Sequence, residues 1–197
     1  MDAIEAMETC RAIRYLKPDP VPQALIEKVI YAATRASSPG NSQGWDFVVL
    51  RERATKAKLG PVLRERLLPL VQSMPTTPGA VTRMIDGAQH LLHEFENVPV
   101  WIIVCGRKVY PPGAATDQMV DAALYPAAQN LIVAARSLGL GTTFTTFQVA
   151  TEEEMRKVLG IPSDASIAVC IALGYPDRPF GPVKRKPVAE VIHWDHW

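Results

Sequence analysis

The chain has 197 residues, of which 48% are apolar and 21% charged, and its formal net charge at pH 7 is +1. This length is enough for one domain with a substantial core, so we expect residues 1–197 to form a single domain. A nearly neutral chain offers no electrostatic basis for binding nucleic acid or an anionic membrane.

No stretch resembles a signal peptide, and no apolar run reaches the roughly 18 residues that span a bilayer. The three cysteines, Cys10, Cys105 and Cys170, lie far apart and form no CxxC pair, which argues against a zinc knuckle or a dithiol redox site. The last two lie in apolar runs, where a thiol behaves as a small hydrophobic group. We therefore expect a cytoplasmic protein with reduced cysteines.

The first part of the chain predicts helices followed by a strand. Residues 1–36 are typical of two helices joined by the turn KPDPVP, and apolar residues recur at helical spacing from Leu25 to Ala33. The turn-forming segment SSPGNSQG at 37–44 predicts a loop, and WDFVVL at 45–50 predicts a short strand.

The next part alternates between regular and irregular segments. Residues 53–71 predict a charged helix, whereas 72–82 (QSMPTTPGAVT) predict an irregular loop or lid. The run VPVWIIVCG at 98–106 predicts a buried strand, and YPPGAAT at 110–116 predicts another break in the regular structure.

Residues 117–138 predict a long helix that is apolar on nearly every face. Such a helix has to be covered all round, which indicates packing against its own sheet and against a partner subunit. Pro126 lies inside this helix and is expected to kink it locally, because it removes one backbone hydrogen bond.

The C-terminal part predicts two strands on either side of a short helix. GLGTTFTTF at 139–147 predicts a break and a strand, and TEEEMRKVLG at 151–160 predicts a helix capped by Thr151. SIAVCIALGY at 166–175 predicts a buried strand, which a proline-rich tail follows. This irregular alternation is typical of an α+β (mixed α/β) domain with about four strands.

Several catalytic motifs are missing from the sequence, among them GxSxG, a Walker lysine loop and HExxH. GLGTT lacks the third glycine of a dinucleotide fingerprint. His90 and His93, with Glu94 and Glu96 nearby, make a metal site conceivable. Because no third ligand is placed, an exposed helix face explains them better, and we expect no metal.

Two basic clusters remain as candidate sites. Arg11 and Arg14 have the i,i+3 spacing that puts two side chains on one helix face, and Lys184–Lys186 reads KRK. Guanidinium groups suit phosphate, since they offer several donors in a planar fork. Solvated surface charge is the commoner explanation of such clusters, and spacing alone does not bring the two ends together.

Four segments, taken in order, resemble the nitroreductase family of flavoproteins from about residue 8 to residue 193. They are TCRAIRYLKPDPVP, ASSPGNSQGWDFVVL, AAQNLIVAARSLGLGTTFTT, and ALGYP with KRKPVAEVIHW. The resemblance implies a nitroreductase-like fold, in which helices flank a central, mostly antiparallel sheet of four to five strands. It also implies an intertwined homodimer with FMN at the subunit interface.

The resemblance also implies which residues bind FMN. Residues near both ends of the chain, all of them basic except Ala12, would hold the ribityl phosphate, a loop from the neighbouring subunit would reach the isoalloxazine, and one strand would pass the flavin ring. The positions in this sequence are, in that order, Arg11, Ala12, Arg14 and Arg185; Ser38, Pro39, Asn41 and Gln43; and Thr145 and Thr146.

This sequence departs from the family pattern at three positions. Cys10 stands where a basic residue is usual, Ala12 where a serine is usual, and Gly44 where a proline usually follows the glutamine. One guanidinium contact and one hydroxyl contact to the phosphate are therefore expected to be missing or replaced.

The implied activity is electron transfer from NADPH or NADH through FMN to a small acceptor such as a nitroaromatic or a quinone, in a ping-pong sequence. The flavin carries the chemistry, so no catalytic residue of the chain is expected. Alternatives within the family are a reductive dehalogenase and a flavin-fragmenting enzyme. An alternative outside enzymes is a flavin-binding protein with little turnover.

Overall fold

In the computed structural model, which describes residues 1–76 and 79–197, an antiparallel sheet lies at the centre. Its described strands follow the order β1-β2-β4-β3, and their bounds are β1 Trp45–Leu50, β2 Val100–Arg107, β3 Gly141–Thr145 and β4 Ala165–Gly174. The central strands β2 and β4 are buried almost throughout, because their apolar residues face both sides. The predicted α+β fold with a mostly antiparallel sheet is confirmed.

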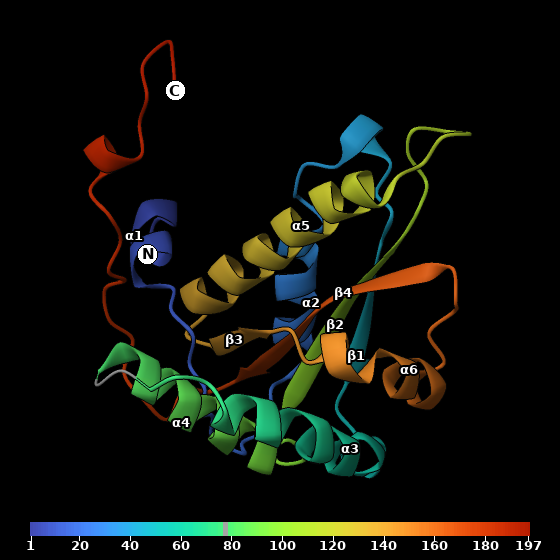
Figure 1. The fold of residues 1–197 in the computed structure, drawn as a ribbon, viewed down its shortest axis with the longest axis vertical. Helices are drawn as coiled ribbons and strands as arrows, with labels where there is room; N and C mark the ends of the chain where they lie inside the picture. Colours follow the sequence, from blue (N-terminus) through green and yellow to red (C-terminus); the bar gives the residue numbers. More distant parts are fainter. Residues whose placement is uncertain (77–78) are drawn as a thin grey trace.

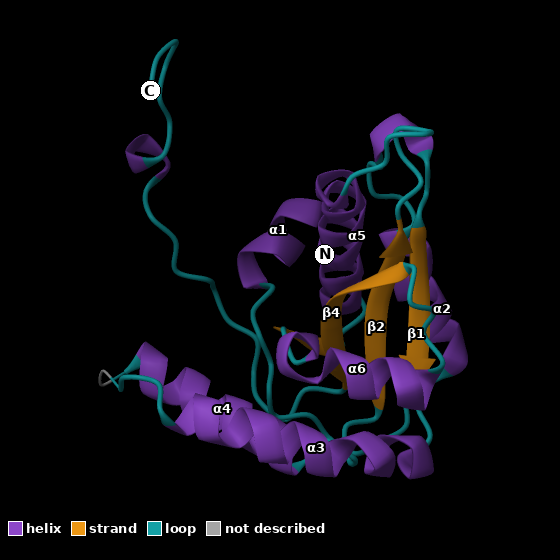
Figure 2. Cartoon of the chain, turned by 45° about the vertical axis from the view of Figure 1, so that its right-hand side comes forward, coloured by secondary structure: helices purple, strands orange, loops and turns teal. Residues whose placement is uncertain are grey.

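Helices cover both faces of this sheet (Figures 1 and 2). Helices α2 and α5 pack on one face, and α3, α4 and α6 on the other. Successive residues of β2 face opposite sides of the sheet. Ile102 packs into the core under α2 and α5, whereas Trp101 and Ile103 pack into the core under α3, α4 and α6. The helix bounds are α1 Ala3–Thr9, α2 Gln23–Ala33, α3 Arg53–Gln72, α4 Ala80–His93, α5 Asp117–Ser137 and α6 Gln148–Leu159, with short 3-10 turns η1 Pro39–Asn41 and η2 Val188–Glu190.

The N-terminal segment differs from its prediction. Helix α1 ends at Thr9, and Cys10 is already extended. Beyond it, the Ile13 amide donates to the Thr142 carbonyl at 2.8 Å, which attaches the segment to the outer edge of β3. The prediction that Arg11 and Arg14 share a helix face is therefore wrong, because pairing with the sheet replaces the helix there.

Helix α5 forms where a long helix was predicted and begins at a Thr116 cap, whose hydroxyl accepts from the Met119 amide. One side of it is buried against the sheet and α2. The opposite side exposes a row of residues at helical spacing, namely Ala122, Tyr125, Pro126 and Gln129. Pro126 thus lies on the face that the chain itself leaves uncovered.

Two predicted boundaries change. The segment 72–82 is shorter than predicted, since α3 includes Gln72 and α4 begins at Ala80; residues 77–78 of it lie outside the described residues. Helix α6 starts three residues before its predicted start at Thr151. Thr151 has non-helical backbone angles within it, and its hydroxyl donates to the Phe147 carbonyl at 2.8 Å.

The C-terminal segment leaves the sheet after β4, passes α1 and extends away from the body of the chain (Figure 1). Every residue from 184 to 197 is exposed, and Trp194 retains 82% of its accessible surface. Within the described ranges, no helix combines the length and apolar character needed to cross a membrane.

Glu96 accepts two hydrogen bonds from Arg64 of α3, at 2.8 and 2.9 Å. These bonds hold the pKa of Glu96 below its ordinary value. The pair therefore stabilises the fold above that ordinary pKa of about 4.3 and loses its contribution as the pH falls through the lowered value. We expect Glu96→Gln to lower the free energy of unfolding by about 1–2 kcal/mol near neutral pH.

Urea unfolding at neutral and acidic pH measures this difference, which should shrink in acid. The matched control is Glu152→Gln, because Glu152 pairs with Arg156 on the surface of α6 and is 49% exposed. The free energy of unfolding of this control variant should fall by about 0.5 kcal/mol or less. Equal losses in the two variants at every pH would contradict the prediction.

Candidate functional site

A pocket of about 480 Å³ lies between the N-terminal segment and α4. Its charged lining is dominated by guanidinium groups, with Asp86 as the single acid. The arginines come from three separate parts of the chain: Arg11, Arg14, Arg83 and Arg178. This excess of positive charge suits an anionic ligand.

Arg14 is the central residue of this pocket. Its side chain crosses α4 at Gly87, where an added Cβ would lie 2.6 Å from the Arg14 Cδ. Burial, and then the nearby charge of Arg11, lower the pKa of Arg14. No described residue forms an ion pair or hydrogen bond with its guanidinium. A half-buried cation without a partner favours a ligand with negative charge or hydrogen-bond acceptors.

Aromatic contacts hold the outer wall of the pocket. The Tyr15 ring stacks on His90 with centroids 4.2 Å apart, and the Arg178 guanidinium lies 4.7 Å from the Tyr15 centroid. His90 is thus part of a stack. Across residues 1–76 and 79–197, no group of three metal-ligating side chains is found.

An apolar pocket of about 330 Å³ adjoins the first and shares Arg14 with it. Residues 143–147, at the end of β3, form one wall, and the last turns of α3 form another. Thr145 is buried there, and its hydroxyl donates to the Cys170 carbonyl at 2.8 Å, so this hydroxyl holds the strand. Thr146 is exposed. The two pockets together offer a cationic end and an apolar slot.

The two ends of the chain meet beside this cavity, which spacing alone could not show. The Val183 amide donates to the Glu8 carbonyl at 2.9 Å, so the C-terminal segment runs along the end of α1. Burial raises the pKa of the Cys10 thiol, while the positive charges of Arg136 and Arg185 act to lower it. Both guanidinium groups therefore lie within electrostatic range of Cys10.

The loop predicted to reach the flavin from a neighbouring subunit, residues 38–43, lies apart from both of these pockets. The turn η1 sits beside the N-terminal end of α5 (Figure 1), whereas the last turn of α5 is bonded through Arg136 to Thr9, just before the segment that carries Arg11 and Arg14. The Ser38 hydroxyl accepts from the Gln43 amide at 3.1 Å. Asn41 and Gln43 both have positive φ, at 51° and 49°, which is uncommon outside glycine and frequent at functional sites.

Gly44 has a structural reason to replace the usual proline. A Cβ at Gly44 would lie 2.7 Å from a Val109 methyl group and 3.0 Å from the Arg107 carbonyl. The Arg107 amide also donates to the Gly44 carbonyl at 2.9 Å. Close backbone approach therefore restrains the end of this loop.

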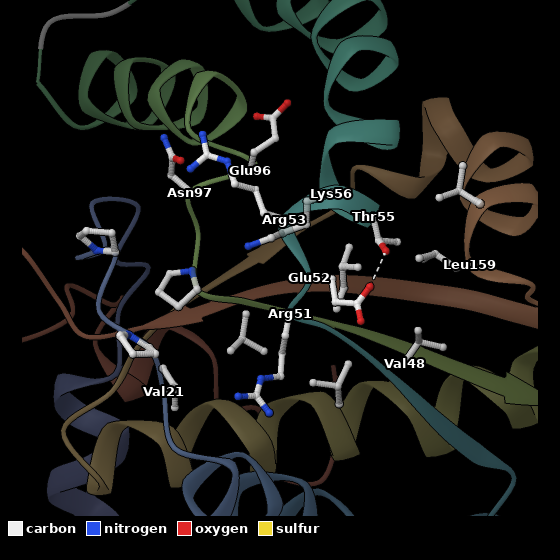
Figure 3. Close-up of a pocket in the computed structure, with 17 residues that line it drawn as sticks. Val21, Val48, Arg51, Glu52, Arg53, Thr55, Lys56, Glu96, Asn97 and Leu159 are labelled. Carbon is white, nitrogen blue, oxygen red and sulfur yellow. Dashed lines mark hydrogen bonds between the residues drawn. The ribbon is translucent and has the colours of Figure 1, made fainter.

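A larger groove of about 860 Å³ contains none of the predicted site residues (Figure 3). It lies between the end of β1 and the start of α3. Lys56, only 3% exposed, donates to the Val98 carbonyl there at 2.5 Å, and burial lowers its pKa. Because its ammonium group is bonded to the backbone just before β2, we infer that Lys56 has a structural role in the fold.

The residues present fit FMN. The unpaired guanidinium groups match a phosphate, and the apolar slot beside Arg14 matches a planar ring. Arg83 and Arg178 of the cationic pocket, and Arg136 near Cys10, were not predicted from the sequence. Each lies far along the chain from the N-terminal motif, so no local pattern marks it.

The fold and this site define an antiparallel α+β protein with an arginine-rich cavity beside its edge strand. The sequence pattern of the Nitroreductase family matches residues 8–175, so the chain belongs to the Nitroreductase family.

Two relatives and a solved structure illustrate the similarity. NADH dehydrogenase from Thermus thermophilus is 30% identical over 203 residues, covering 98% of this chain and 96% of that protein. Iodotyrosine deiodinase 1 from Rattus norvegicus is 26% identical over 202 residues, covering 95% and 67%. A nitroreductase with bound FMN from Desulfitobacterium hafniense has the same fold, with a TM-score of 0.73, 19% identity, and coverage of 99% and 100%.

The three thiols should differ in reactivity. Burial raises the pKa of Cys105 to about 11 and that of Cys170 to about 12, whereas Cys10 is only half-buried. Because the thiolate is the reacting form, we expect Ellman's reagent to modify Cys10 alone in the native protein at neutral pH. All three should react after unfolding. Rapid modification of a second thiol in the native protein would contradict this prediction. So would a Cys10→Ser variant in which the number of rapidly modified thiols does not fall.

Proposed function

We propose that this chain is an FMN-dependent oxidoreductase that transfers electrons from NADPH or NADH to a small acceptor such as a nitroaromatic or a quinone. FMN, when bound, accepts and donates the hydride, while the protein binds and orients it. Nicotinamide and acceptor would occupy the same open side of the pocket in turn, in a ping-pong sequence.

The observation that carries this proposal is that basic residues from both ends of the chain lie in one region: Arg11 and Arg14 line the cationic pocket, and Arg185 lies within electrostatic range of Cys10. None of them forms an ion pair with a described carboxylate. In the proposed complex, Arg11 and Arg185 bind the phosphate beside the Ala12 backbone. Arg14, shared by the cationic and apolar pockets, contacts the ring, and Thr145 and Thr146 line its edge.

The position of the loop at 38–43 supports a homodimer with the flavin at the subunit interface. Helix α5 separates this loop from the arginines, and a helix of 21 residues is about 30 Å long. One flavin therefore cannot contact both in the same chain. A second copy could supply Ser38, Pro39, Asn41 and Gln43. The uncovered row on α5 and the exposed C-terminal residues are suited to the same contact.

The segment 72–82 is proposed to influence acceptor choice. Met74 lines the apolar pocket together with Met84 from α4, so the described part of the segment borders the proposed ring site. The side opposite β3 is therefore where an acceptor would meet this segment. Exchanging it should change acceptor preference more than FMN affinity.

The deiodinase relative favours a second candidate, a specialised reductive dehalogenase. The same arginines would hold the cofactor in that case, so only the acceptor differs. A flavin-fragmenting enzyme, or a flavin-binding protein with little turnover, would also use this site. Screening nitroaromatic, quinone and halogenated aromatic acceptors against the reduced enzyme separates these candidates.

Anaerobic addition of NADPH or NADH to the FMN-loaded protein should bleach the visible flavin absorbance. A nitroaromatic or quinone should then restore it. Absorbance spectroscopy measures both half-reactions, and free FMN at equal concentration is the control. A protein that binds FMN but is bleached by neither nucleotide would refute the oxidoreductase proposal, and one that takes up no FMN would refute every flavin function.

Arg185→Ala should weaken FMN binding by about 10- to 150-fold, because it removes one charge-assisted contact worth about 1.5–3 kcal/mol. Fluorescence titration of the apoprotein measures the dissociation constant. The matched control is Arg51→Ala, since Arg51 lies in the separate groove of Figure 3 and should have no effect. An unchanged dissociation constant in Arg185→Ala would assign this arginine to the solvated surface.

A further inference from the structure

Arg136, in the last turn of α5, is held in a fixed position beside the end of α1. Its Nε donates to the Thr9 hydroxyl at 2.9 Å, and that hydroxyl donates in turn to the Glu5 carbonyl at 2.8 Å. Its guanidinium lies over the Phe180 ring, 4.0 Å from the centroid. These contacts restrain the side chain on two sides and use only one of its nitrogens. The two terminal nitrogens have no acceptor among the described residues.

The C-terminal segment brings further guanidinium groups to the same place. It contains Phe180, and Arg11 lies against the next residue, with its Nη1 3.6 Å from the Cβ position of Gly181. The charges of Arg136 and Arg185 both act on the Cys10 thiol. Figures 1 and 2 show α1 and the C-terminal segment side by side, with the C-terminal end of α5 next to α1.

Three separate segments therefore carry guanidinium groups in this region: Arg136 and Arg185 both act on Cys10, and Arg11, the residue after Cys10, lies against Gly181 beside Phe180. None of the three arginines forms an ion pair with a carboxylate of the described residues. A phosphate dianion would offset their positive charge, and the free edge of the Arg136 guanidinium is a suitable donor. Cys10, on which the charges of Arg136 and Arg185 act, occupies the position where the family pattern has a basic residue.

We propose that Arg136 supplies, from α5, the guanidinium missing at Cys10, and that it binds the phosphate of the flavin cofactor. The inference rests on the proposed function, since it assigns a further ligand to the same cofactor. Thr9 and Phe180 position this side chain, and its contact with the phosphate adds to those of Arg11 and Arg185.

The test compares FMN with riboflavin, which has the same ring and ribityl chain but no phosphate. Fluorescence titration of the full-length apoprotein should show that Arg136→Gln weakens FMN binding by about 10- to 150-fold, the loss expected for one charge-assisted contact. Riboflavin binding should be unchanged. Arg136→Lys, which keeps the charge, should retain part of the preference for FMN, and Arg51→Gln should retain all of it.

A merely structural role gives a different result, because a displaced α1 or C-terminal segment would weaken FMN and riboflavin equally. Equal weakening would overturn the inference, as would an Arg136→Gln variant with the wild-type preference for FMN. Thermal unfolding of each apoprotein identifies a variant that has lost its fold. Thr9→Val then provides the second measurement: it removes the orienting bond and should reduce the FMN preference with little effect on riboflavin.

The double variant Cys10→Arg, Arg136→Gln tests the replacement itself. It should recover FMN affinity relative to Arg136→Gln alone, and a folded double variant without recovery would overturn the claim that Arg136 replaces the residue at position 10. The proposed function fails separately: wild-type protein that binds neither flavin refutes the flavin site. Equal affinity of wild type for FMN and riboflavin refutes the phosphate clamp as a whole.

Discussion

The pairing of the N-terminal segment with β3 determines where most of the candidate ligands lie. The Ile13 amide bonds to the Thr142 carbonyl, the Thr143 hydroxyl donates back to the Ile13 carbonyl at 2.6 Å, and the Ile13 side chain is only 3% exposed. Neighbouring side chains in an extended segment point to opposite sides, so burial of Ile13 turns Arg14 outward, across α4. The cavity exists because this short segment is extended and attached to the sheet.

In the proposed homodimer, the rigidity of the sheet and of α5 would be the reason that the flavin site needs a second copy of the chain. Strands β2 and β4 are buried on both faces of the sheet, and α5 is packed along one of these faces. Neither the sheet nor α5 can therefore bend to bring the loop at 38–43 to the arginines. The loop is itself restrained by the Ser38 bond and by backbone contacts at Gly44. In the proposed homodimer, a second subunit would join these two half-sites at opposite ends of one helix.

The sequence predicted those parts of the fold that depend on local apolar pattern. The runs that became β2, β4 and α5 are continuous and strongly apolar, and each formed close to its predicted bounds. The N-terminal helix was extended too far because i,i+3 spacing carries no information about Thr142, the partner of Ile13 almost 130 residues away. The early start of α6 was missed because Thr151 resembles a cap, although it lies inside the helix.

The candidate site was predictable only where residues lie within a recognisable motif. Arg11, Arg14 and Arg185 belong to segments that resemble the family, but the structure was needed to show that the two ends of the chain meet beside Cys10. Arg136 could not be found in this way, since its bond to Thr9 joins residues 127 positions apart. On sequence alone it is a basic residue near a helix C-terminus, where favourable interaction with the helix dipole explains it fully.

The proposed distribution of the phosphate clamp over three segments would also explain how the chain could lose the usual residues at positions 10 and 12. A phosphate has several acceptor oxygens and tolerates donors from many directions, so its site depends on the total charge and on the rigidity of the donors. Arg136 meets the second requirement through Thr9 and Phe180, which restrain it before any ligand arrives. In the proposed arrangement, the departure from the family pattern at Cys10 and the position of Arg136 are two aspects of one phosphate site.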